Sequence, residues 1–452
     1  MSDNHDVIVV GGGISGLLAT LALAKEGKDA LLLEKSSFLG GNCRTYNVEG
    51  FWVDTGPHAI THIDDGPLPR LMEKYFDYLP YFIPYGNYYI RSKSRLTKFP
   101  WTAQDWVKFS VLPRKDRIQL AQTIASAVTS SSFGSKDLNQ SVYDYLKKHS
   151  FSTKTWRFID AFSYFMSGVS MHETPAWRMM KGARYLDESK AVDLSKRFRG
   201  QVNKFIKLVR FHGAYHQAYP RRGIQSITEC VVHSFPEKKA TVKKGEEVKE
   251  ILVKDGKVRG VATDKDTYQG DLVVFSGYTK TLPGLITGGL PERYLDNLNK
   301  LKQSNTLTIW LGLREKYNGF NYQGSEIWFE EEMPYWATPT SNHDNWLAPE
   351  GKQLVGFSTF ADGKQRDVKE KLLETIYTVH PELEKLVEVE HTQQLIPEKA
   401  AISVGAQFPG QESPIEGLYL VGTDTDYRSM GVTRAAFSVE KLLEILKKKR
   451  LV

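Results

Sequence analysis

Cysteine is scarce in this 452-residue chain, which holds only Cys43 and Cys230. Two cysteines are too few for a disulfide framework, so we expect a reducing, cytoplasmic setting. No apolar run approaches the roughly 18 residues that a membrane-spanning helix needs. The first predicted strand begins at Asp6, which leaves no room for a signal peptide. These absences argue against a disulfide-stapled secreted domain and an integral membrane protein.

Several other functional signatures are also missing. We find no internal repeat, low-complexity segment, P-loop, Ser-His-Asp order or metal-ligand spacing, so no metal is predicted. The net charge of +7 favours an anionic partner, but the sequence contains no recognisable nucleic-acid-binding module. The alternatives are an anionic membrane surface and a merely solvated basic surface. With 41% hydrophobic and 25% charged residues, the chain is expected to be globular with two domains.

What the sequence does contain is a nucleotide-binding pattern at its start. Residues 6–16 read DVIVVGGGISG, an apolar predicted strand over Asp6–Val10 followed by G-x-G-x-x-G spacing. Glycine permits the tight turn, lets the backbone approach a pyrophosphate, and lets helix and strand pack closely. A helix predicted over about residues 15–26 points its N-terminus at the phosphates, and Glu34 ends the second strand where it can bind the adenosine ribose. The sequence therefore predicts one adenine dinucleotide.

Helical patterns dominate the middle of the chain. Residues 68–212 combine helical periodicity with many aromatics, in stretches that include 141–151, 155–169 and 197–210. A Ser-rich break at 129–141 is expected to be a surface loop between helices.

Strand patterns return after Pro220. We predict, in order, a helix from Ile224, a hairpin about Asp255-Gly256, a buried parallel strand at 271–277, an antiparallel sheet from 305–361, a strand and turn at 417–425, and a helix over 430–449. The fold class is therefore α/β, with a Rossmann-like dinucleotide-binding domain in three segments and an interleaved α+β domain that caps its carboxyl edge. The expected bounds are 1–67, 215–290 and 395–452 for the first domain, and 68–214 and 291–394 for the second.

Four segments resemble the superfamily of FAD-dependent amine oxidases, phytoene desaturases and protoporphyrinogen oxidases. They read VVGGGISGLLATLALAKEG, LLLEKSSFLGGNCRTY, GFWVDTGPHAI and GLYLVGTDTDYRSMGVTRAAFSV. The resemblance covers nearly the whole chain and is closest to the phytoene desaturase-like oxidoreductases. It implies an FAD-binding domain and a substrate domain. It also implies noncovalent FAD, because the C-terminal cysteine that carries the flavin in monoamine oxidases is absent.

The resemblance also implies particular cofactor contacts. Gly40, Gly41 and Arg44 match the element that contacts the FAD pyrophosphate and ribityl chain, and a guanidinium suits a diphosphate. The segment 54–58 matches the element that passes under the flavin. Val248 matches the family valine whose backbone recognises adenine.

At the C-terminus, Asp424 matches the acid that bonds the ribityl chain, and Asp426 is the alternative because Thr423 interrupts the commoner pattern. Gly431 begins a helix that the family aims at the flavin pyrimidine ring, where its dipole stabilises negative charge. The predicted cofactor-binding residues are Gly11, Gly13, Ile14, Ser15, Gly16, Glu34, Lys35, Gly40, Gly41, Asn42, Arg44, Gly56, Pro57, His58, Val248, Gly422, Asp424, Gly431, Val432 and Thr433.

The segment Tyr75–Trp101 is rich in aromatics interspersed with basic residues. It suits peripheral contact with a membrane, or alternatively the lining of a core or cavity. An aromatic substrate domain fits a long apolar substrate better than a small polar amine. We therefore predict desaturation, or the reverse saturation, of an isoprenoid or carotenoid-like lipid by hydride transfer to flavin N5, with a quinone or oxygen as electron acceptor.

His58, His172 and Asp160 are the candidates for the proton acceptor, with a hydrogen bond to a backbone carbonyl as the alternative role of His58. Three other functions stay open. One is protoporphyrinogen-oxidase-like chemistry. Another is amine oxidation, which needs an aromatic pair facing the flavin and a lysine near N5. The third is a non-enzyme that resembles the Rab GDP-dissociation inhibitors and carries a prenylated protein without flavin; Arg44 and Asp424 argue against it.

Overall fold

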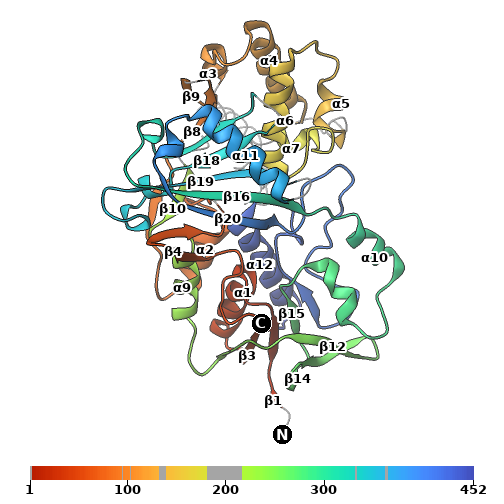
Figure 1. Ribbon diagram of the computed structural model, residues 1–452. Coiled ribbons are helices and arrows are strands. Elements are labelled where there is room, and N and C mark those ends of the chain that lie inside the picture. The colour runs from red at the N-terminus through yellow and green to blue at the C-terminus, as the bar shows by residue number, and fades with distance from the viewer. Residues whose placement is uncertain are drawn as a thin grey trace.

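The computed structural model describes residues 3–452 with gaps at 57, 94, 102, 132–138, 181–215, 331–332 and 362–364. Pro57 and the helical pattern expected over 197–210 therefore lie outside the described residues. Figure 1 shows three regions: a parallel sheet with its helices near both termini, a large sheet across the middle, and a cluster of helices beyond that sheet.

The region near the termini is built on a five-stranded parallel sheet in the order β11-β3-β2-β15-β21. Its strands are β2 (Val7–Val10), β3 (Ala30–Glu34), β11 (Ala240–Lys244), β15 (Val273–Phe275) and β21 (Leu418–Leu420). The inner strands are almost wholly apolar because both faces of the sheet are covered. The predicted strands at 6–10, 271–277 and 417–425, and the strand that ends at Glu34, are confirmed.

Helices cover one face of this sheet. They are α1 (Ile14–Lys25), α2 (Pro67–Tyr75), α9 (Gln225–His233) and α12 (Gly431–Lys448). Leu17, Ile227 and Val439 from these helices share one core with Val9 of the sheet. The helices predicted over 15–26, from Ile224 and over 430–449 are confirmed close to their expected bounds.

A second, four-stranded sheet covers the other face. It consists of β1 (Asp3–Asn4), β14 (Thr267–Gln269), β13 (Lys257–Thr263) and β12 (Val248–Lys254). The predicted hairpin between β12 and β13 is confirmed. Asp255 and Gly256 have φ values of 54° and 73°, the two positive angles that a tight two-residue hairpin turn requires. The short helices η5 (Thr279–Leu285) and α10 (Glu292–Asn299) follow β15.

The middle of the molecule is a seven-stranded sheet in the order β20-β16-β19-β18-β17-β8-β9. Its strands are β8 (Asn87–Ser92), β9 (Arg95–Lys98), β16 (Ser304–Leu313), β17 (Gly324–Trp328), β18 (Tyr335–Thr338), β19 (Gln353–Phe360) and β20 (Val387–Glu398). The predicted antiparallel sheet in 305–361 is confirmed, although β17 also pairs with β8 in parallel. Helix α11 (Gln365–Val379) packs against the sheet.

The helices beyond the sheet correct two predictions. They are α3 (Ala103–Lys108), α4 (Arg114–Ser131), α5 (Val142–Leu146), α6 (Thr153–Ser167) and α7 (Ala176–Met180). Helix α4 continues through 129–131, where a loop was expected, because serine disfavours a helix only weakly. Residues 82–84, 87–92 and 95–98 form strands rather than helix. In that segment Tyr88 and Ile90 are buried on alternate positions, a two-residue period that marks a strand.

Two small sheets join the regions. One contains β6 (Ile60–Thr61), β10 (Gln217–Pro220) and β7 (Phe82–Pro84), and the other pairs β4 (Thr45–Val48) with β5 (Phe51–Asp54). Among the described residues, no helix has both the length and the apolar character that crossing a bilayer requires.

Candidate functional site

The turn between β2 and α1 holds the glycine-rich motif. Gly11 has a φ of 102°, and a Cβ on Gly16 would lie 2.0 Å from the carbonyl oxygen of Gly11. Glycine is therefore required at both positions. Gly13 is the N-cap of α1 and offers no side-chain cap. The backbone N–H groups of the first helical turn, which begins with Ile14 and Ser15, consequently point toward any anion bound there.

Glu34 closes the neighbouring strand at the same edge. Its two carboxylate oxygens accept hydrogen bonds from the backbone N–H groups of Gly12 at 2.6 Å and Ser36 at 2.8 Å. The next residue, Lys35, is exposed. Val248 begins β12 and is nearly buried. The acidic residue thus lies against the glycine turn, and its role toward the adenosine ribose stays a prediction.

The element at 40–44 folds back on the glycine turn. The N–H of Gly40 donates to the carbonyl of Gly12 at 2.8 Å. A Cβ on Gly41 would lie 3.2 Å from the Cα of Gly13. These close approaches explain why paired glycines follow β3, and they place the element beside the N-terminus of α1.

The polar side chains of that element have other partners. The side-chain amide of Asn42 donates to the carbonyl of Ile396 at 2.8 Å. The guanidinium of Arg44 lies 3.6 Å from the centre of the Phe38 ring, within a side cavity that α9 also lines. The role of Arg44 toward a diphosphate stays a prediction.

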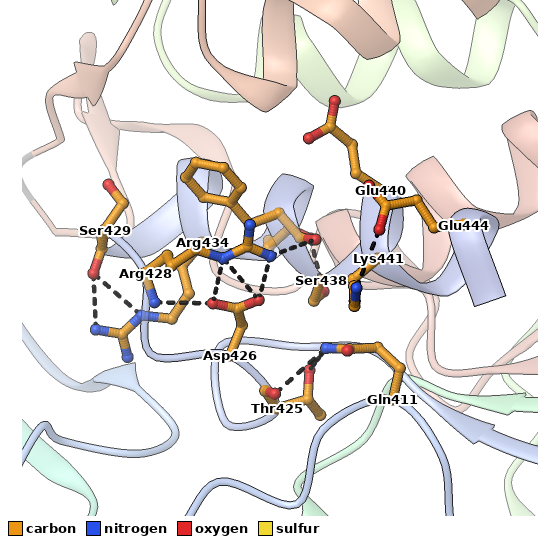
Figure 2. Close-up of polar contacts among 12 residues, drawn as sticks. Gln411, Thr425, Asp426, Arg428, Ser429, Arg434, Ser438, Glu440, Lys441 and Glu444 are labelled. Atoms are coloured by element: carbon orange, nitrogen blue, oxygen red, sulfur yellow. Dashed lines mark hydrogen bonds and ion pairs between the residues drawn. The ribbon is translucent and has the colours of Figure 1, made fainter. Parts of the chain in front are cut away.

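Two acidic residues after β21 differ sharply in their surroundings. Asp424 is fully buried, and its Oδ2 accepts the N–H of Thr279 at 2.7 Å. Its Oδ1 has no hydrogen-bond partner among the described residues. Asp426 instead pairs with Arg428, whose Nε and terminal nitrogen lie 3.0 and 2.7 Å from its oxygens (Figure 2). Gly422 keeps the free oxygen approachable, because a Cβ there would lie 2.7 Å from it.

The N-terminus of α12 lies nearby. Its N-cap, Met430, provides no side-chain cap, and Gly431 has a φ of 52°. The hydroxyl of Thr433 donates to the carbonyl of Thr61 at 2.9 Å, so this side chain is turned toward β6. Val432 is nearly buried in the core.

A buried guanidinium organises the same turn. Arg434 donates to the carbonyls of Ser429 at 2.8 Å, Ala400 at 2.9 Å and Thr423 at 3.1 Å. Figure 2 shows Arg434 and Ser429 beside the pair of Asp426 and Arg428. Arg434 therefore ties the turn before α12 to the segment after β20.

A cavity of about 360 Å³ connects this region with the middle sheet. One end is lined by Gly56, His58 and the first residues of α12. The rest is lined by aromatic side chains of the middle sheet, of the segment after β9 and of α6, including Tyr88, Phe99, Trp101, Phe162, Phe165 and Trp336. No lysine is among the described residues that line it. The cavity is therefore one continuous, largely apolar space.

Of the three predicted proton acceptors, only His58 lines this cavity. Its Nε2 lies 2.8 Å from the carbonyl oxygen of Thr55, so the alternative role, a bond to a backbone carbonyl, is observed. Burial lowers the pKa of His58, although Asp54 opposes the shift. His58 is therefore neutral at pH 7.

His172 and Asp160 do not belong to the described lining, which corrects their placement at the site. His172 is exposed and stacks on Tyr143, with the ring centres 4.3 Å apart. Asp160 accepts the N–H of Met171 at 2.7 Å, which fixes the loop after α6. Burial raises the pKa of Asp160. Its carboxylate, however, already accepts the backbone hydrogen bond that fixes this loop.

Comparison with known proteins agrees with this arrangement. A family model described as flavin containing amine oxidoreductase matches residues 14–438. The all-trans-retinol 13,14-reductase of Homo sapiens is 33% identical over 100 residues, 21% of this chain and 16% of that protein. The carotenoid 3,4-desaturase of Haloarcula japonica is 44% identical over 80 residues, 17% of this chain and 15% of that protein. Both alignments thus span under a fifth of each relative's length.

The comparison with solved structures spans nearly the whole chain. A crystal structure of an oxidoreductase from Methanosarcina mazei has a TM-score of 0.75 at 19% identity, over 97% of this chain and 99% of that one. The Rossmann-like sheet, the glycine turn and the cavity agree with a flavin-dependent oxidoreductase. The chain belongs to the flavin-containing amine oxidoreductase family, and its cofactor is FAD. The non-enzyme alternative is thereby set aside.

Proposed function

We propose that FAD lies across the carboxyl edge of the five-stranded sheet, bound noncovalently, with its isoalloxazine ring in the cavity beside α12. The uncapped first turn of α1 suits a diphosphate. The partnerless oxygen of Asp424 suits a ribityl hydroxyl, since a buried acceptor needs a donor. The N-terminus of α12 at Gly431 suits the pyrimidine end of the flavin, where negative charge develops on reduction.

The substrate we propose is an isoprenoid or carotenoid-like lipid. The observation that carries this proposal is the continuity of the cavity from Gly56 and Gly431 to the aromatic cluster around Phe165 and Trp336. Such a space suits a long apolar chain and excludes water from the reacting carbon. The retinol reductase and the carotenoid desaturase among the relatives support this substrate class. They also leave both directions of reaction, saturation and desaturation, within the proposal.

When bound, FAD supplies the two-electron chemistry by exchanging a hydride with the substrate. The protein's part is to orient the substrate carbon, because a well-positioned reactant lowers the barrier without an acid or base. Of the three predicted proton acceptors, the neutral imidazole of His58 is the one that lines the cavity, which the titratable groups of His62, Asp65 and His216 also line. A quinone or oxygen is the proposed final electron acceptor.

Contact with a membrane is part of the proposal, but through a short loop only. Most aromatics of the segment 75–101 are core or cavity residues, among them Tyr85, Tyr88 and Phe99. Tyr78, Leu79 and Tyr81 instead expose 59%, 63% and 69% of their surface. Exposed aromatics beside basic residues suit the headgroup layer of an anionic bilayer.

Anaerobic spectroscopy tests the substrate class directly. Carotenoid or retinoid lipids, porphyrinogens and amines are added in turn to the yellow holoprotein, and flavin absorbance is followed. We expect only the isoprenoid lipids to bleach the flavin or, with prereduced flavin, to restore its colour. Bleaching by amines alone would establish amine oxidation, and bleaching by porphyrinogen alone would establish the protoporphyrinogen-oxidase-like alternative.

A further inference from the structure

A lysine outside every sequence motif lies at the proposed dinucleotide crevice. Lys399 directly follows β20, the edge strand of the seven-stranded sheet. Its ammonium nevertheless reaches the other sheet, where it donates to the carbonyls of Ser276 and Gly277, both at 2.8 Å. These two carbonyls follow the end of β15, next to the strand that leads into the glycine turn. Lys399 therefore stands at the carboxyl edge of the parallel sheet.

The ammonium of Lys399 lies between two acidic residues at the carboxyl edge of the parallel sheet. Nζ lies 3.7 Å from the position that a Cβ on Gly422 would occupy, beside the turn that carries Asp424. Burial lowers the pKa of Lys399, while the charges of Asp424 and Glu34 oppose that shift. The lysine thus interacts both with the acid expected at the adenosine ribose and with the acid expected at the ribityl chain. A diphosphate links those two groups in FAD.

The backbone around Lys399 is held in place. Its N–H donates to the hydroxyl of Thr423 at 3.2 Å. Arg434 binds the carbonyls of both Ala400 and Thr423, so the lysine segment and the acidic turn share one anchor. A half-buried side chain on a fixed backbone is preorganised for a ligand.

Polar atoms without partners cluster at the same place. Ser276 Oγ, Thr279 Oγ1 and Asp424 Oδ1 are buried and have no hydrogen-bond partner among the described residues. Thr279 and Asp424 are joined by the 2.7 Å bond from the Thr279 N–H, so they belong to one cluster. Buried polar groups are normally satisfied, and several unsatisfied ones in one crevice indicate a polar ligand.

We propose that Lys399 is the counter-cation of the FAD diphosphate. Two of its three N–H donors bind the carbonyls of Ser276 and Gly277, and the third is directed to a phosphate oxygen. Arg44, the cation that the family resemblance implies for this role, is stacked on Phe38 in the side cavity that α9 lines. The inference rests on the proposed placement of FAD, and it is independent of the lipid substrate.

Affinity measurements on the full chain, stripped of flavin, test this assignment. FAD binding is followed by flavin fluorescence for the wild type, Lys399→Met and Lys399→Arg, and binding of ADP and of adenosine is measured by calorimetry. Loss of a charge-assisted bond to phosphate should weaken FAD and ADP by about 10- to 100-fold in Lys399→Met. Adenosine, which carries no phosphate, should bind all three proteins equally, and Lys399→Arg should retain most of the FAD affinity.

Lys302→Met is the matched control, since Lys302 pairs with Glu173 on the surface while its backbone carbonyl binds the N–H of Ala401. It removes the same charge and should leave FAD affinity unchanged. Equal FAD affinity of wild type and Lys399→Met would overturn the assignment of Lys399 alone. A wild-type chain that binds neither FAD nor ADP would instead overturn the proposed FAD placement.

Discussion

Arg91 and Glu326 form a bidentate ion pair inside the seven-stranded sheet, across the parallel pairing of β8 and β17. The Arg91 Nε lies 2.6 Å from one carboxylate oxygen, and both side chains are almost inaccessible to solvent. Tyr322 also donates to Glu326, and His380 lies 3.5 Å away. Burial alone would raise the pKa of Glu326, but the bonds from His380 and Arg91 outweigh it and hold the pKa low.

Removing one partner of this ion pair should lower the free energy of unfolding far more than removing both partners. Glu326→Leu leaves a buried guanidinium unpaired, and we expect the free energy of unfolding to fall by about 3–5 kcal/mol. Arg91→Met combined with Glu326→Leu should recover most of that loss. Urea unfolding of the three proteins measures the difference. A double variant no more stable than the single one would show that the pair itself stabilises the sheet.

Substitution of Asp424 by Asn should weaken FAD binding, whereas the same substitution of Asp426 should not. Asp424→Asn keeps the shape but weakens the free acceptor, and we expect FAD affinity to fall about tenfold. Asp426→Asn changes a carboxylate that already pairs with Arg428, so flavin affinity should stay near the wild-type value. Flavin fluorescence titration measures both. The reverse order would make Asp426 the ribityl ligand.

His62 should make stability depend on pH. Burial lowers its pKa to about 4, Asp65 opposes the shift, and His216 adds to it. The folded chain therefore keeps this imidazole neutral, while the unfolded chain protonates it below its ordinary pKa of about 6.5. As pH falls from 6.5 to 4, the free energy of unfolding should drop by on the order of 2 kcal/mol from this residue.

The comparison variant is His62→Asn, because His62 has a φ of 57° and asparagine tolerates that conformation. Unfolding is measured for both proteins at several pH values. The wild type should lose more stability than the variant across that window. Parallel curves would mean that His62 titrates normally in the folded chain.

The aromatic end of the cavity should control lipid binding. Phe165 lines the cavity and packs on Trp336, with ring centres 4.3 Å apart. Phe165→Ala should raise the KM for the lipid about tenfold by removing apolar contact, with the flavin spectrum unchanged. Phe151→Ala is the control, since Phe151 is buried in the same core but is not among the described lining residues. Equal effects on KM would indicate general loosening.

The features that could be predicted from the sequence are those that residues close together in the chain encode. The glycine turn, Glu34 and the hairpin at Asp255-Gly256 are encoded within short stretches, so they were predicted at their positions. The preference for Asp424 over Asp426 came from the family resemblance alone, and the pairing of Asp426 with Arg428, which agrees with it, is visible only in the fold.

Lys399 carries no signal of its own in the sequence. It follows a strand of one sheet and binds the end of a strand in the other, so only the tertiary fold reveals it. Strand β8 was missed for a related reason. Its aromatics occur among helical patterns, and only its pairing with β17 and β9 shows that they alternate across a sheet.

Strand β20 connects the seven-stranded sheet with the region of the parallel sheet. This strand belongs to the large sheet and leads directly into the residues that Arg434 anchors beside the acidic turn. A ligand that restrains the residues just after β20 therefore also restrains β20 itself, the edge strand that forms a wall of the cavity. We therefore expect occupancy by the dinucleotide to raise the affinity for the proposed lipid, and the loaded protein to melt in a single cooperative transition.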